Sequence, residues 1–364
     1  MSDRLLINLS FLQSQPTGLG IYAKNLIPQL RVLSPTLLTA NAFTDFTCEL
    51  IPPYLSQDKG TKGHFKRLLW TQFQLSKRYR QLKGALLFSP VPEAPIYTNC
   101  RYIVTVHDLI PLRFSRRFSA LTAYYRYYLP FVLNQAQHII TNSQTTANDL
   151  VEIFNIAATK ITPILLAYDA ERFQPINLEN QPFPSVPPYF LYMGRYDPHK
   201  NLSRLIRAFA AIPNRQDCQL WLVGSPDERY RPILAQLATD LAVKSAVKFI
   251  DYLPNEALAT IINQAIALVF PSLWEGFGLP VLEAMACGTA VITSNLSSLA
   301  EVTGQEAAML VNPYNVAEIS TAMTTMLHDT GIRDHFSQLG LKRASQFSWE
   351  ETGKQTVEVL SQFL

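Results

Sequence analysis

The stretch Glu275-Gly-Phe-Gly-Leu-Pro-Val-Leu-Glu283 follows a short apolar run, Ala267–Phe270, and leads into a segment of helical character. A strand, a glycine-containing loop and a helix with proline in its first turn form the repeating unit of a parallel α/β sheet. Backbone N–H groups of such a loop stand beside a helix N-terminus, which predicts an anion site. Both glutamates are placed to face one ligand, and carboxylates accept hydrogen bonds from vicinal sugar hydroxyls. The alternative is a tight turn whose acidic residue complements the helix dipole.

The same alternation of apolar runs and amphipathic segments continues through the whole chain. Strands are expected at Leu5–Leu9, Ala85–Phe88, Tyr102–Val106, His138–Thr141 and Ile161–Leu166, and again at Tyr189–Met193, Gln219–Val223, Val247–Ile250, Ala267–Phe270 and Ala290–Thr293. Helices are expected at Ile21–Leu33, Leu121–Gln137, Asn201–Ala211, Arg231–Leu241, Asn255–Asn263, Pro280–Cys287 and Val316–Thr325. This pattern predicts an α/β protein of two Rossmann-like, doubly wound domains facing across a cleft, with ligand at the carboxyl ends of the strands.

A proline-rich segment separates the two halves. Residues 174–188 contain five prolines, which suits an extended linker. A chain of 364 residues is also long for a single core. We therefore expect an N-terminal domain over 1–173, a linker over 174–188 and a second domain over 189–346.

Charge is distributed unevenly between the halves. Residues 1–170 hold 17 Lys and Arg against 9 Asp and Glu, whereas the rest hold 14 against 19. Basic residues alternate with aromatic residues in His64–Arg80 and Arg113–Tyr128. Such a surface suits an anionic membrane or a pyrophosphate-linked lipid acceptor, and a solvated basic face is the alternative. No nucleic-acid motif accompanies these segments, so nucleic acid is not an expected partner.

Cysteine spacing and the N-terminal sequence indicate the compartment. The four cysteines are far apart and form no zinc or disulfide pattern, so we expect buried thiols in a reducing cytosol. There is neither a signal-peptide pattern nor an apolar run of transmembrane length. The expected location is cytoplasmic, with a peripheral contact at the inner face of the membrane as the further hypothesis.

Two cations follow the first strand of the second domain. Arg195 and Lys200 lie between Tyr189–Met193 and the helix expected at Asn201–Ala211. Cations at the carboxyl edge of a sheet can stabilise a diphosphate without a metal ion. A solvated loop with ordinary surface cations is the alternative for either residue alone. The chain has no paired-aspartate motif on a suitable loop, which agrees with a site that needs neither metal nor cofactor.

Three features at strand ends are candidate site residues of the first domain. Gly18 and Gly20 follow the first strand, where glycine permits close approach of the backbone to a phosphate or an acceptor. A plain strand-to-helix turn is the alternative. His107 ends the strand Tyr102–Val106, so it is either a catalytic residue or a structural histidine. Asn142-Ser143 is placed to touch the acceptor or to cap the helix that follows.

The second-domain motifs together resemble the retaining glycosyltransferases of family 4 (glycosyl transferases group 1), which have the GT-B fold. The E-x7-E pattern from Glu275 to Glu283 carries the resemblance, with Gly194-Arg195 and Lys200-Asn201 upstream and Glu301–Gly304 downstream. Phe347-Ser348-Trp349-Glu350 opens a final helix, which in this fold crosses back to pack on the first domain over 347–364. The resemblance covers nearly the whole chain.

The resemblance implies a role for each matched residue. Glu275 would hold hydroxyls of the transferred sugar, together with the backbone of Gly276, Phe277, Gly278 and Leu279. Glu283 would hold the ribose hydroxyls, Arg195 and Lys200 the diphosphate, and the base would rest near Gly224 and Asp251–Leu253. His107 would lie beside the sugar. The implied reaction is retaining, by front-face displacement without an enzymic nucleophile.

The implied substrates are a nucleotide-sugar donor and a glycan or lipid-linked acceptor, in the synthesis of cell-surface polysaccharide or glycolipid. GDP-mannose is the first expected donor, by resemblance to bacterial mannosyltransferases, and UDP-glucose and other UDP-sugars come next. Two other functions remain open. A Rossmann-type oxidoreductase would require a GxGxxG fingerprint after the first strand, which the sequence lacks. A non-catalytic nucleotide-sugar-binding protein would keep the same site residues.

Overall fold

The chain divides into two compact units in a computed structural model that describes residues 4–13, 18–55, 60–115, 119–177, 187–215, 218–225, 227–251, 253 and 255–364. The first unit comprises Met1–Leu166 with Ser348–Leu364, and the second comprises Ala167–Phe347. The first unit thus ends several residues before the expected boundary at 173. The start of the expected linker packs on the second unit, because the Ile176 amide donates to Asn263 Oδ1 at 2.9 Å. Residues 178–186 of that linker lie outside the described parts of the chain.

A seven-stranded parallel sheet in the order β3-β2-β1-β4-β5-β6-β7 forms the first unit. Its strands are β1 (Arg4–Asn8), β2 (Thr36–Thr39), β3 (Thr47–Leu50), β4 (Gly84–Ser89), β5 (Tyr102–Val106), β6 (His138–Thr141) and β7 (Ile161–Pro163). The sequence did not predict β2 or β3, which are four residues long. The edge strand β3 contains no fully buried residue, so it lacks the apolar run that marks a central strand.

Helices cover this sheet, and two of them contain π-helical turns. They are α1 (Gly18–Gln29), α2 (Gly60–Trp70), α3 (Ser76–Gln81), α4 (Ile110–Arg113), α5 (Ala120–Ala123), α6 (Leu129–Gln135) and α7 (Gln144–Phe154), with short 3-10 turns at Leu30–Leu33, Pro53–Leu55 and Ala158–Lys160. The π-helical turn η4 (Thr71–Leu75) joins α2 to α3, and η5 (Tyr124–Tyr128) joins α5 to α6. The single helix predicted at Leu121–Gln137 is therefore interrupted by a π-turn.

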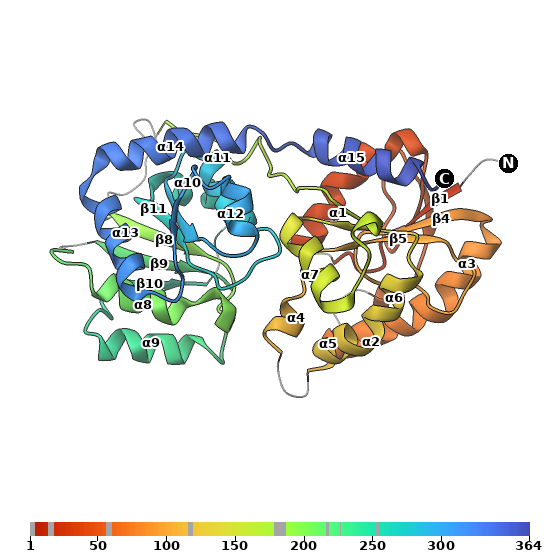
Figure 1. The fold of residues 1–364 in the computed structure, drawn as a ribbon, viewed down its shortest axis with the longest axis horizontal. Helices are drawn as coiled ribbons and strands as arrows, with labels where there is room; N and C mark the ends of the chain where they lie inside the picture. Colours follow the sequence, from red (N-terminus) through yellow and green to blue (C-terminus); the bar gives the residue numbers. More distant parts are fainter. Residues whose placement is uncertain are drawn as a thin grey trace. The chain divides into compact units, whose positions relative to one another are not determined.

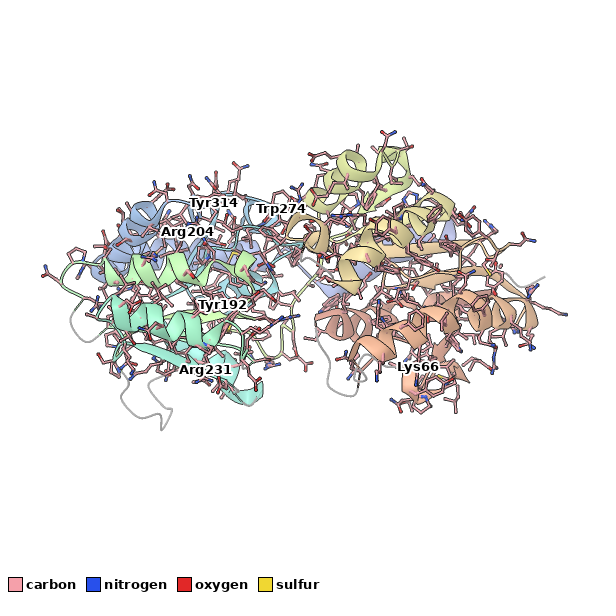
Figure 2. All side chains as sticks on the ribbon, turned by 90° about the horizontal axis from the view of Figure 1, so that it is seen from below. Lys66, Tyr192, Arg204, Arg231, Trp274 and Tyr314 are labelled. Carbon is pink, nitrogen blue, oxygen red and sulfur yellow. The ribbon has the colours of Figure 1, made fainter. Side chains whose placement is uncertain are left out.

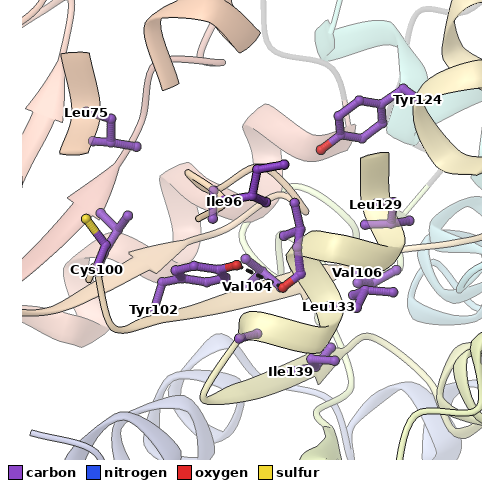
Figure 3. Close-up of a cluster of buried hydrophobic side chains, with 14 of the residues drawn as sticks. Leu75, Ile96, Cys100, Tyr102, Val104, Val106, Tyr124, Leu129, Leu133 and Ile139 are labelled. Atoms are coloured by element: carbon purple, nitrogen blue, oxygen red, sulfur yellow. Dashed lines mark hydrogen bonds between the residues drawn. The ribbon is translucent and has the colours of Figure 1, made fainter. Parts of the chain in front are cut away.

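The core of the first unit lies between these helices and the sheet (Figure 3). Leu75 from η4, Tyr124 from η5 and Leu133 from α6 pack together with Val104 on β5. The Tyr102 hydroxyl donates to the Val132 carbonyl at 3.0 Å, which satisfies the one polar atom of this buried ring. These helical segments therefore pack on the same strand, β5.

The C-terminal helix α15 (Trp349–Ser361) belongs to the first unit, which confirms the prediction that it crosses back (Figure 1). Ser348 caps it by accepting from the Glu351 amide at 3.1 Å. The Thr352 hydroxyl donates to the Leu165 carbonyl at 2.8 Å, and α15 lies against α1. A side chain at Gly353 would meet Gln29 Cβ at 2.2 Å, so glycine permits this close approach.

The second unit is built on a six-stranded parallel sheet in the order β10-β9-β8-β11-β12-β13. Its strands are β8 (Tyr189–Met193), β9 (Gln219–Val223), β10 (Val247–Ile250), β11 (Ala267–Phe270), β12 (Val291–Ser294) and β13 (Met309–Val311). Its helices are α8 (Leu202–Ala210), α9 (Arg231–Asp240), α10 (Asn255–Gln264), α11 (Leu279–Ala286), α12 (Ser298–Thr303), α13 (Val316–His328) and α14 (Thr330–Ala344), with a 3-10 turn, η8, at Pro198–Lys200. The strand order reverses between β8 and β11, and ligands of doubly wound sheets bind at that point.

The four cysteines are free thiols, as the sequence predicted, but one expectation about their burial was wrong. Cys100, Cys218 and Cys287 are buried, whereas Cys48 is only half-buried because it lies on the edge strand β3. None of the helices in the described parts of the chain is both long enough and apolar enough to span a membrane.

Candidate functional site

Two loops leave the carboxyl edge of the second sheet side by side, because β8 and β11 are hydrogen-bonded neighbours. One runs from Gly194 to Asn201, and the other from Pro271 to Gly278. The Asn201 side-chain amide donates to the carbonyls of Pro271, at 3.0 Å, and Pro313, at 2.6 Å. The Leu273 amide donates to the His199 carbonyl at 2.7 Å. These bonds fasten the two predicted site loops to each other.

A buried ion pair connects the same loops. Lys200 Nζ lies 2.7 and 2.9 Å from the two carboxylate oxygens of Glu275. Only 16% of the lysine side chain and 9% of the glutamate side chain are exposed. Phe270 covers the ammonium group, with its ring centroid 5.2 Å from Nζ. The sequence assigned these residues to different parts of one ligand, and the structure brings their charges into direct contact.

Hydrogen bonds from the start of α12 support the loop that carries Glu275. The Glu275 amide donates to Ser297 Oγ at 3.1 Å. Ser298 Oγ lies 3.0 Å from the carbonyl oxygens of both Glu275 and Phe277, so its one O–H serves two acceptors. Sequence reasoning missed both serines. Their position at a helix start, just after the strand next to β11, was the available signal.

Two close backbone approaches at this edge require glycine. Gly278 adopts a φ of +107°, and a side chain there would meet Leu299 Cδ2 at 2.6 Å. A side chain at Gly224 would lie 2.0 Å from the Gly194 carbonyl oxygen. The positive φ requires glycine at position 278, and the contact with a backbone oxygen requires it at position 224. The amide-rich loop beside α11 and the turn after β9 therefore depend on these glycines.

A cavity of about 440 Å³ opens beside Arg195, lined also by Tyr196, Ser225, Asp227, Glu228 and Arg229. The Arg195 side chain is 71% exposed, and its Nε lies 3.1 Å from Asp197 Oδ2. Tyr192, inside the unit (Figure 2), donates its hydroxyl proton to the Arg195 carbonyl at 2.7 Å and so fixes this turn. Hydrogen bonds from Arg229 lower the pKa of Asp227 to about 2. Because its side chain is largely exposed, the guanidinium of Arg195 is accessible at the rim of this polar cavity.

The cavity differs in one respect from the predicted base site. Ser225, the residue after Gly224, lines the cavity, whereas no described residue of the segment 251–253 does. Asp251 instead forms an ion pair with Arg231, and Tyr252 lies outside the described residues. Asp227 and Arg229, which the sequence did not suggest, occupy the place beside Gly224.

Glu283 lies in α11 and is half-buried. Burial raises the pKa of its carboxyl to about 7, the nearby carboxylate of Asp169 adds to the rise, and Arg172 opposes it. The group therefore titrates close to neutral pH. Ionisation makes both oxygens full acceptors, whereas protonation turns one of them into a donor.

The remaining predicted residues belong to the first unit. His107 Nε2 lies 2.9 Å from the Pro90 carbonyl, and the ring packs edge-on against Tyr22 of α1, 4.8 Å between centroids. Burial lowers the pKa of His107 to about 4, so the ring is neutral at pH 7 and donates from Nε2. Gly18 and Gly20 lie in the first turn of the same helix. Residues 14–17 of their loop lie outside the described parts.

Ser143 takes the structural role that the sequence offered as an alternative. Its Oγ accepts from the Thr146 amide at 3.1 Å, so it caps α7. Metal binding has no corresponding feature: among the described residues, no three His, Cys, Asp or Glu side chains come together in a metal-binding group.

Two family profiles match the chain, one in each half. The profile described as "Glycosyltransferase Family 4" matches residues 17–172, and "Glycosyl transferases group 1" matches residues 173–343. Both were expected from the motifs around Arg195 and Glu275.

Several relatives carry mannosyltransferase names. O-antigen chain mannosyltransferase B of Escherichia coli is 32% identical over 62% of this chain and 60% of its own length. The serotype-specific mannosyltransferase WbdA of Escherichia coli is 31% identical over 76% of this chain. O-antigen chain mannosyltransferase RfbU of Salmonella typhimurium is 27% identical over 85% of this chain and 87% of its own length. The matched part of this chain spans only 34% of WbdA and under two thirds of mannosyltransferase B.

Solved structures share the fold over nearly the whole chain. Sucrose-phosphate synthase from Thermosynechococcus elongatus has a TM-score of 0.78 at 21% identity, covering 99% of this chain and 98% of its own. Anabaena HepE, solved in complex with UDP and glucose, has a TM-score of 0.74 at 17% identity, covering 99% of each chain. Both likenesses concern the fold alone.

The ion pair predicts a specific stability pattern. Glu275→Gln leaves the Lys200 ammonium buried without its counter-charge and should lower the free energy of unfolding by about 3 kcal/mol. The double variant Lys200→Met with Glu275→Gln removes both charges and should recover most of that loss. Urea denaturation of the two single variants, the double variant and the parent measures the coupling. Additive losses in the double variant would show that the two groups do not interact.

Proposed function

Because the chain belongs to the family 4 glycosyltransferases (glycosyl transferases group 1) with the GT-B fold, we propose that it transfers a hexosyl unit from a nucleotide-sugar to a glycan or lipid-linked acceptor. The product would be a cell-surface polysaccharide or glycolipid. The names of the relatives favour GDP-mannose as the first donor to test. UDP-sugars come second, because HepE was solved with UDP. The Lys200–Glu275 pair at the strand reversal is the observation that carries the proposal.

The proposed transfer requires a site that stabilises the negative charge that grows on the leaving diphosphate. Arg195 is accessible at the rim of the 440 Å³ cavity, and Lys200 lies on the same loop. We assign both cations to the diphosphate, where they take the place of a metal ion. When Lys200 turns to the phosphate, the Glu275 carboxylate is released to accept hydrogen bonds from the sugar hydroxyls. The ion pair thus keeps both charges satisfied until the donor arrives.

The proposed reaction retains the configuration at the anomeric carbon. The bond from that carbon to the phosphate oxygen breaks, and a bond to the acceptor oxygen forms on the same face. The acceptor proton passes to the departing phosphate oxygen, so no enzymic nucleophile is needed. Positioning and charge stabilisation then supply the rate enhancement.

We assign His107 to the transferred sugar and the first unit to the acceptor. Gly18 and Gly20 are assigned to a loop that contacts a phosphate or the acceptor. Because the pKa of His107 is about 4, its ring would act through hydrogen bonds and not as a general acid at neutral pH. An oxidoreductase receives no support from the relatives. A binding protein without turnover is the alternative, and the next experiment distinguishes it.

Donor turnover tests the proposal directly. Incubation with GDP-mannose, UDP-glucose and other UDP-sugars should release the nucleoside diphosphate, with GDP-mannose the best donor. Glu275→Ala should lower kcat by about 100-fold or more while it weakens binding of the free diphosphate far less. Arg195→Ala should damage both. The exposed Glu306→Ala in the same unit is the control and should match the parent. Binding of nucleotide-sugars without any release would favour the non-catalytic alternative, and no binding would exclude the assignment.

The raised pKa of Glu283 predicts how nucleotide affinity changes with pH. The ionised carboxylate binds the ribose hydroxyls, and its fraction falls as the pH drops through about 7. Affinity for GDP, measured by calorimetry, should therefore weaken toward acid pH, by at most about tenfold per pH unit. Since the terminal phosphate of GDP also titrates, Glu283→Gln is the reference. If GDP affinity changed with pH equally in the parent and in the variant, Glu283 would not be the group that binds the ribose.

A further inference from the structure

Large apolar side chains are exposed mainly on the first unit. Among the side chains that the structure describes, all such residues except Ile233 and Tyr314 belong to it. Three of them follow one another at intervals of four along α2 and η4. Phe65 is 62% exposed, Leu69 45% and Phe73 64%. Side chains at this interval share one face of a helix.

Only basic charges accompany these apolar side chains in the sequence. Residues 60–84 contain seven Lys and Arg and no Asp or Glu. Lys62, Lys66 and Lys77 are exposed, and Figure 2 labels Lys66 in the lower part of the first unit as drawn. We call Lys62, Phe65, Lys66, Leu69, Phe73 and Lys77 the α2 surface. It combines an apolar strip with positive charge.

A shallow groove of about 480 Å³ continues this surface, lined by Tyr54, Lys66, Leu69, Trp70, Phe73 and Gln74. Lys66 Nζ lies 6.0 Å from the Tyr54 ring centroid. Tyr54 follows β3, so the groove begins at the carboxyl edge of the first sheet.

Buried polar contacts fix the helix with its apolar strip outward. On the inner side, Arg67 donates to Glu93 at 2.7 and 2.6 Å and is fully buried. Gln72 donates to the Ile96 carbonyl at 2.7 Å and accepts from the Ile96 amide at 3.1 Å. If the helix rotated to bury Phe65 or Leu69, these bonds would break and the buried charges of Arg67 and Glu93 would lose their partners. The exposed strip is therefore a fixed feature of the folded unit.

We propose that the α2 surface binds an anionic lipid bilayer. The three lysines would lie among the phosphate headgroups, while Phe65, Leu69 and Phe73 enter the outer acyl layer. Charge complementarity selects this partner, since the segment has no acidic residue that anionic headgroups would repel. Nucleic acid would satisfy the lysines but leaves the apolar strip without a role. The inference does not depend on the proposed function, because membrane binding requires neither donor nor acceptor.

Vesicle sedimentation of the full chain tests the proposal. The protein should bind vesicles of phosphatidylcholine with phosphatidylglycerol much more tightly than phosphatidylcholine alone. Lys62→Gln, Lys66→Gln and Lys77→Gln together should weaken binding by about 100-fold, since each lysine near such a surface contributes about fivefold. Phe65→Ser, Leu69→Ser and Phe73→Ser together should remove the binding that persists at high salt. The matched control is Ile233→Ser with Tyr314→Ser, which should bind as the parent does.

Circular dichroism and melting temperature establish that each variant is folded, and a second measurement reports insertion. A Phe73→Trp variant should show added fluorescence that brominated acyl chains quench. Equal affinity for the two vesicle types, unchanged binding of the Phe65, Leu69 and Phe73 variant, or no quenching would each overturn the proposal. Binding of a DNA duplex that depends on the lysines alone, without vesicle binding, would identify a polyanion site instead and overturn it as well.

Discussion

The buried ion pair between Lys200 and Glu275 constrains the architecture of the second unit. Its two charges stay out of water only if the loops after β8 and β11 meet within hydrogen-bond distance. Asn201 fastens the loops together, and the serines at the start of α12 support the loop that carries the glutamate. The sheet order supplies the remaining condition, since it places β8 and β11 side by side at the point of reversal.

The pair also explains how two charged side chains can be buried at this edge of the sheet. Two buried charges of opposite sign satisfy each other, whereas either charge alone would lose its hydration without compensation. In the proposed function, the diphosphate takes the place of Glu275 beside Lys200. The sugar hydroxyls take the place of Lys200 beside Glu275. Arg195 needs no such arrangement, because its guanidinium is largely exposed at the cavity rim. The two proposed phosphate ligands therefore differ in how they are held before the donor binds.

Much of this could be predicted from the sequence, and the failures have physical causes. The strands β8, β9 and β11 were predicted with the bounds that the structure gives, because central parallel strands are largely apolar runs. The edge strand β3 and the largely polar helix α14 lack such runs and were missed. Glu275 and Lys200 were identified from motifs, but their contact depends on two loops that are far apart in the chain. Ser297 and Ser298 contact a loop that is distant in the chain, so their position at a helix start signals a cap and not the support of Glu275.

A crystal structure with a nucleotide-sugar bound tests the central claim most directly. The account predicts that Lys200 Nζ leaves Glu275 and lies about 2.7–3.2 Å from a diphosphate oxygen, while the Glu275 carboxylate accepts hydrogen bonds from sugar hydroxyls. A donor bound with the Lys200–Glu275 pair intact, and with neither side chain in contact with it, would contradict the account.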